Sequence, residues 1–175
     1  MTPARIAAAV AALMTVLLLQ ATVVSPVLQP APASLPALLV AAIALVDGPG
    51  TGLTFGFVAG LVADLGSEHP AGVLALCWLG VGVACGALSS SLGSIRRDAA
   101  IAALACGSAA LVSQVLIAVF ARDTDGIVEA IRLVVPAILL DALLALAVVP
   151  IVRVFLHSES LRAPRPVLLL EGGVE

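Results

Sequence analysis

Asp64 is the carboxylate whose surroundings follow the most regular pattern in the sequence. It comes after Gly52, Gly56 and Gly60 at a constant spacing of four residues, and Gly72 opens the next apolar run. On a helix this spacing places three glycines and one carboxylate along one face, and a face without Cβ atoms lets a neighbouring backbone approach closely. The face therefore predicts either packing within the chain, which we favour, or the docking of a partner protein. The same spacing recurs as Gly82, Gly86 and Ser90 and as Ala102, Cys106 and Ala110.

Asp141 is the second unusual carboxylate, because it lies deep within an apolar run. A carboxylate at the centre of a membrane costs about 2.5–3.5 kcal/mol on insertion scales, so it should face protein or water. Gln114 is the most plausible hydrogen-bond partner nearby, and we predict that both side chains are buried. A proton relay and a structural role both fit Asp141. We favour the structural role, because no second buried acid lies at helical spacing.

No combination of side chains in the sequence predicts catalysis or metal binding. Asp47, Asp64 and Glu68 partly match the aspartate signature of the CDP-alcohol phosphotransferases, but Ala44 occupies the position of an earlier carboxylate in that signature. A site for divalent cations cannot lose such a ligand. Serine, histidine and acidic residues are not grouped for nucleophilic catalysis, and the glycines do not form a phosphate-binding loop. We therefore expect a protein that is not an enzyme, with no cofactor and no metal site.

The composition places these residues in a membrane. Of the 175 residues, 62% are hydrophobic and 11% are charged, and the mean hydropathy is +1.22. A soluble domain has about 45–50% apolar and about 25% charged residues, and a disordered chain has fewer apolar residues still, so both classes are excluded. Lysine is absent and no basic block is present, so we do not expect nucleic-acid binding. What remains is an integral protein of the lipid bilayer.

We predict an all-α integral membrane protein, with a compact bundle of six transmembrane helices forming a single domain over residues 1–156. The second and third helices are short, about 20 Å each against a hydrocarbon core of about 30 Å, so they form either a short helical hairpin or a re-entrant pair. Charged stretches over 96–98 and 122–126 are expected between helices. Residues 157–175 are expected to be a mostly irregular tail. The predicted helices are 6–27, 35–46, 53–65, 72–92, 99–120 and 128–155.

The arginines predict the orientation of the bundle. The first run could be a cleaved signal peptide, but its length of about 22 residues fits a retained span better. Six crossings with the N-terminus inside leave Arg122 and Arg132 outside and the other arginines inside. The positive-inside rule then favours a cytoplasmic location for both termini and for the tail. The inside arginines are Arg5, Arg96, Arg97, Arg153, Arg162 and Arg165.

The segment over 52–65, GLTFGFVAGLVADL, continues through GVLAL over 72–76 and resembles the core motif of the rod shape-determining protein MreD family. That motif reads roughly GFxxGLxxD followed by Leu or Ile, a short polar turn, and LGxxxL. Gln20, the pair Leu35-Pro36, and Asp141 followed by Pro150 agree with the same family. The likeness is spread over residues 15–156, and its specific part is 52–76.

The resemblance implies a non-enzymatic scaffold in the bacterial plasma membrane, within the machinery for cell elongation, rod shape and peptidoglycan synthesis. The implied partner is a periplasmic coiled-coil protein similar to MreC, bound through the transmembrane or periplasmic face. The peptidoglycan synthase pair and MreB filaments are implied as further partners, directly or indirectly.

A second function is implied by a likeness in fold. The family is similar in its six-helix architecture to the substrate-binding components of energy-coupling-factor transporters, so a small-molecule-binding component of such a transporter is the alternative. A transporter site needs convergent polar groups near the membrane midplane, and few polar residues are available there. We therefore favour the scaffold.

Overall fold

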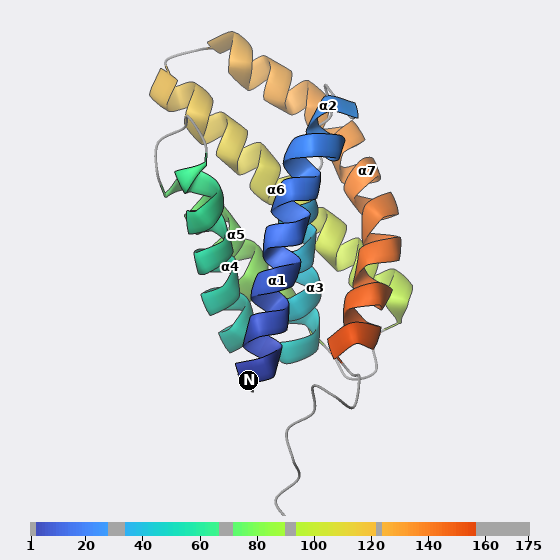
Figure 1. The fold of residues 1–175 in the computed structure, drawn as a ribbon. Helices are drawn as coiled ribbons and strands as arrows, with labels where there is room; N and C mark the ends of the chain where they lie inside the picture. The colour runs from blue at the N-terminus through green and yellow to red at the C-terminus, as the bar shows by residue number, and fades with distance from the viewer. Residues whose placement is uncertain (1–2, 28–33, 67–71, 90–93, 122–123, 157–175) are drawn as a thin grey trace, which may run out of the picture.

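Helices make up almost all of the chain that the structure describes. The computed structural model describes residues 3–27, 34–66, 72–89, 94–121 and 124–156 (Figure 1). The first helical segment is α1 (Pro3–Leu19), which continues through the π-helix η1 (Gln20–Val24) into α2 (Ser25–Val27). The remaining helices are α3 (Leu35–Asp47), α4 (Pro49–Leu65), α5 (Val73–Ala87), α6 (Ile95–Ala121) and α7 (Thr124–Leu156). With α1, η1 and α2 counted as one segment, the predicted all-α architecture of six helices is confirmed for the described residues.

The central helix of the bundle is α3. It contacts α1, α4, α5, α6 and α7, and every residue from Leu35 to Leu45 is buried. Figure 1 shows α1 running along the bundle from one end to the other, with α4 and α5 on one side of it and α7 on the other. A helix that is apolar all round is expected where no face meets water, and α3 meets neither water nor much lipid because five helices surround it.

Three helices contain long apolar segments and three are short. The segments Arg5–Val24, Ile95–Ile117 and Pro136–Leu156 are long and apolar enough to cross a membrane by length and composition. In contrast, α3, α4 and α5 have 13, 17 and 15 residues. At a rise of about 1.5 Å per residue these three helices are shorter than the hydrocarbon core, so neighbouring helices must shelter their ends.

Three helices begin four residues earlier than the sequence predicted. The first is α4, which begins at Pro49 rather than at 53, since a proline at the first helical position needs no hydrogen-bond acceptor. The second is α6, which begins at Ile95 rather than at 99, because Ser94 Oγ accepts a hydrogen bond from the Arg97 N–H. The charged residues expected before this helix therefore lie in its first turn. The third, α7, begins at Thr124 rather than at 128.

The fourth predicted helix is shorter than expected at its C-terminal end. It was predicted over 72–92, whereas α5 ends at Ala87. The Leu88 N–H still bonds to the Ala84 carbonyl, and the next N–H, from Ser89, bonds to the Gly86 carbonyl in a tight turn that ends the helix. Residues 90–93 and the predicted tail over 157–175 lie outside the described residues.

The start of α1 and the end of α7 lie at the same end of the bundle (Figure 1). Two ion pairs join helices there. Arg5 in α1 binds Asp47 at the end of α3, with 2.7 Å between Nη2 and Oδ1, and Arg153 in α7 binds Asp98 in the first turn of α6. Each pair therefore connects segments that are far apart in the sequence, 42 and 55 residues respectively.

Candidate functional site

The glycine face of α4 packs against α5 of the same chain. At Gly52, Gly56 and Gly60 the atom nearest to an added Cβ is a backbone atom of α5. Membrane helices gain van der Waals contact from such close backbone approach, because lipid supplies no hydrophobic force between them. The contacts pair Gly52 with Gly82, Gly56 with Trp78, Gly60 with Ala75 and Pro49 with Gly86.

Asp64 closes the same interface by binding the N-terminus of α5. Its side chain is buried, with 3% of the residue exposed. Its Oδ2 accepts from the Gly72 N–H at 2.9 Å and from the Ala75 N–H at 3.0 Å, and its Oδ1 accepts from the Leu74 N–H at 3.2 Å. These are groups that the first turn of a helix cannot satisfy by itself, and a negative charge is favourable there. The structure thus places the residues that the sequence grouped along one interface between α4 and α5, namely Gly52, Gly56, Gly60, Asp64 and Gly72.

Gly72 has a backbone conformation that favours glycine and that allows its N–H to bind Asp64. Its φ is +102°, in the left-handed region that side chains disfavour, and it precedes the first residue of α5. This turn presents the Gly72 N–H to Asp64 at the end of α4.

A second polar cluster binds the N-terminus of the central helix α3. Gln20 comes from the π-helix η1 and Asp141 from α7, so side chains of two surrounding helices meet at one point. Pro36 has no N–H and needs no acceptor, and the N–H groups of Ser34, Leu35 and Ala37 each have one. The bonds run from the Ser34 N–H to Asp141 Oδ1 (3.3 Å), from the Leu35 N–H to Gln20 Oε1 (3.0 Å) and from the Ala37 N–H to Ser34 Oγ (3.4 Å).

The prediction that Gln114 is buried and binds Asp141 is wrong. Gln114 is exposed on α6, whereas Asp141 is fully buried. The reason is that the Ser34 N–H, 107 residues away in the sequence, occupies the position of the expected amide partner. Within the described part of the chain, Asp141 Oδ2 has no hydrogen-bond partner.

The sequence did not reveal the ion pair between Asp98 and Arg153. Asp98 is 1% exposed, so its charge is compensated by Arg153 and not by solvent. The sequence contained one indication of this ion pair. Both residues were expected near the cytoplasmic end of a helix, and their charges are opposite. Ser34 was missed in the same way, although Ser followed by Pro two residues later is a typical helix start.

The grooves on the described surface are mostly apolar. Among the described residues, no group of three or more His, Cys, Asp or Glu side chains could hold a metal ion. Grooves between α5 and α6 and between α1 and α7 are lined mostly by aliphatic side chains. The buried carboxylates therefore bind at helix ends and do not converge on a common cavity.

Comparisons with known proteins give one match. The model of the family described as rod shape-determining protein MreD matches residues 5–159 of the chain. Neither a curated protein nor a solved structure matches it.

Proposed function

This chain belongs to the rod shape-determining protein MreD family, and we propose that it is a non-enzymatic membrane scaffold of the machinery that elongates rod-shaped cells. The family match carries the proposal, because it covers residues 5–159 and implies a role in rod shape determination. As a scaffold the chain binds an MreC-like coiled-coil protein. Through that protein or directly, it is connected to the peptidoglycan synthase pair and to MreB filaments.

The use of buried polar groups supports a structural role. Asp64 of α4 binds the start of α5, Asp98 of α6 binds α7, and Asp141 of α7 binds the residue before α3. Each buried carboxylate therefore fixes one helix against another. A protein that holds partners in place needs such a fixed arrangement, whereas a transporter site needs polar groups that converge on a ligand.

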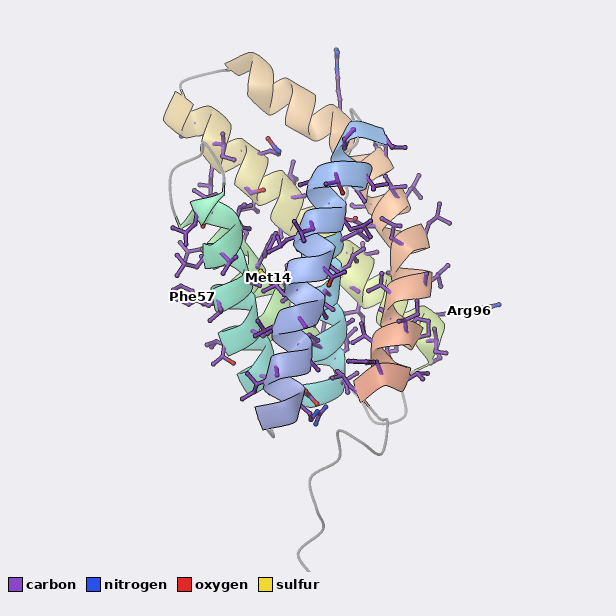
Figure 2. The ribbon with its side chains drawn as sticks, viewed as in Figure 1. Met14, Phe57 and Arg96 are labelled. Carbon is purple, nitrogen blue, oxygen red and sulfur yellow. The ribbon has the colours of Figure 1, made fainter. Side chains whose placement is uncertain are left out.

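The partner has to bind a surface other than the glycine face, because α5 already covers that face. Outward-facing apolar side chains remain available. Phe57 on α4 is 42% exposed and points away from the bundle (Figure 2). Side chains of this kind can contact a transmembrane helix of a partner without disturbing the packing between α4 and α5.

Co-purification tests the proposed function. The full chain, tagged and expressed with the MreC-like protein of the same organism, is expected to retain that protein in mild detergent, and an unrelated single-span coiled-coil membrane protein is the control. Depletion of the chain in a rod-shaped host should make the cells round. Retention of a vitamin and of a transporter module, with no MreC-like protein and normal cell shape, would contradict the scaffold and support the transporter component.

The orientation of the bundle gives a separate prediction. The end of α4 and the start of α6 lie at opposite ends, and Arg96, which points away from the bundle in Figure 2, lies at the same end as the chain's first and last helical residues. In a chain without native cysteines, Gly66→Cys should react with an impermeant maleimide on intact cells, because the positive-inside rule places the arginine-rich end in the cytoplasm. Ile95→Cys should react only after the cells are permeabilised. Labelling of Ile95→Cys alone on intact cells would reverse the orientation.

A further inference from the structure

A groove of about 340 Å³ lies between α1 and α7, with α3 as its floor. Residues of α1 from Ala8 to Val16 form one wall, and residues of α7 from Val148 to Leu156 form the other. Leu39 and Ile43 of α3 lie at the bottom. The α1 wall contains three alanines, so this side of the groove is made of small side chains.

The lining of the groove suits a hydrocarbon chain. Thr15 supplies its one hydroxyl, and that hydroxyl donates to the Ala11 carbonyl of its own helix at 2.9 Å. No lining side chain therefore requires a polar ligand. A polymethylene chain can fill such a groove by van der Waals contact alone.

The length of the groove fits one leaflet of the membrane. Each wall covers nine residues, which at a rise of about 1.5 Å per residue is about 12 Å, less than half of a hydrocarbon core of about 30 Å. A partner helix that crosses the membrane would need a contact surface of greater length. An acyl chain of a single leaflet needs only this one.

The charges at the open end of the groove fit an anionic headgroup. Arg5 lies one turn before Ala8 and Ala9, and its bond to Asp47 at the end of α3 holds it beside the groove floor. Arg5 and Arg153 are each paired with an aspartate, and Arg96 and Arg97 in the first turn of α6 give the described residues at this end of the bundle a net positive charge. Arginines near a membrane surface attract anionic lipids.

We propose that this groove binds one acyl chain of an anionic phospholipid from the leaflet next to the chain's first and last helices, with the lipid phosphate beside Arg5. The bound lipid completes the bundle between α1 and α7. It contacts the apolar walls that α1 and α7 present to the membrane, above the buried floor formed by Leu39 and Ile43 of α3.

Lipid retention by the purified full-length protein tests the proposal. The protein is delipidated in detergent, mixed with phosphatidylglycerol or phosphatidylcholine, and measured by native mass spectrometry. One phosphatidylglycerol should bind per chain. Ala12→Phe fills the groove and should weaken retention about tenfold, whereas Ala11→Phe, the same change at an exposed position on the same helix, should not. Equal retention by the two variants would overturn the proposal.

The headgroup contact has its own variant. Arg5→Gln combined with Asp47→Asn removes both charges of the ion pair, so no unpaired carboxylate is left to disturb the fold. This double variant should weaken retention of phosphatidylglycerol about fivefold, because it removes the guanidinium beside the lipid phosphate while the net charge of this end stays unchanged. Equal binding of both lipids by the unmodified protein would overturn the assignment of an anionic lipid. Loss of the MreC-like protein from Ala12→Phe, with lipid retention unchanged, would show that the groove is a protein site instead.

Discussion

Gly60→Leu is expected to prevent the chain from folding in the membrane, whereas Gly80→Leu leaves it folded. A Cβ at Gly60 would lie 2.5 Å from the Ala75 Cα and 2.6 Å from the Leu74 carbonyl oxygen. These are backbone atoms of α5, so they cannot move away by a change of rotamer as a side chain could. At Gly80 on α5 an added Cβ meets no atom within 4 Å, so leucine at this position has open space.

The expected size of the effect follows from the number of backbone contacts. Overpacking a well-packed core costs typically about 1–3 kcal/mol, and more when the neighbouring backbone must shift. Leucine at Gly60 forces α4 away from α5, which also separates Asp64 from its three N–H partners. The total loss is then comparable to the stability of a typical domain, about 5–15 kcal/mol.

Membrane abundance and size-exclusion profiles in detergent measure this effect for Gly60→Leu, Gly60→Ala and Gly80→Leu. We expect loss of the folded peak for the first, partial loss for the second and a normal profile for the third. A normal profile for Gly60→Leu together with loss of the MreC-like protein would contradict internal packing. It would show that the glycine face binds the partner, which was the other interpretation of this face.

The spacing of the glycines predicted this face but not what covers it. A four-residue period identifies residues on one side of a helix, and both α5 and a partner helix could satisfy it. Gly82 and Gly86 carried the same period, and the structure places them opposite Gly52 and Pro49. The same four-residue spacing of glycines on two consecutive helices therefore indicated that the contact lies within the chain.

The partner of Asp141 could not be predicted from neighbouring helices. The sequence suggested Gln114, which lies on the preceding helix, as the most plausible hydrogen-bond partner nearby. Asp141 Oδ1 instead accepts from the backbone N–H of Ser34, just before α3. This N–H lies next to Asp141 only because α3 packs in the centre of the bundle. Backbone groups of a helix end leave no mark in the side-chain pattern, so pairing by side-chain type misses them.

The positions of the helices were easier to predict than their ends. Apolar runs identified all six segments, because hydropathy determines which residues can lie in a bilayer. The start of α6 was misplaced because Arg96 and Arg97 were read as connecting residues. A serine cap at Ser94 nevertheless starts the helix before them, and charged residues in the first turn can reach the membrane surface.

The same substitution at two buried aspartates should have different effects, large for Asp64→Asn and small for Asp141→Asn. Asp64 accepts three N–H groups with its two oxygens. An asparagine has one oxygen, so in either orientation its NH₂ group faces at least one backbone N–H of α5. Hydrogen bonds to a charged group contribute about 1.5–3 kcal/mol, and the favourable charge at the helix N-terminus is lost as well.

Asp141 is the matched control because it is equally buried but uses one oxygen. An asparagine can keep the bond from the Ser34 N–H through its carbonyl oxygen, and its NH₂ group replaces Oδ2, which has no partner among the described residues. Removing a carboxylate from the membrane interior also removes a desolvation cost. We expect a change of less than about 1 kcal/mol in the free energy of unfolding.

Unfolding in detergent mixtures with increasing denaturing detergent compares the two variants directly, and complementation of cell shape is the second measurement. Asp64→Asn should unfold at a lower fraction of denaturing detergent than the unmodified chain and should support rod shape poorly. Asp141→Asn should match the unmodified chain in both. Equal destabilisation of the two variants would contradict the difference in hydrogen bonding at the two sites. A stable Asp141→Asn that fails to support rod shape would instead favour the proton-relay interpretation, since an amide preserves the bond to Ser34 but cannot exchange a proton as a carboxyl group does.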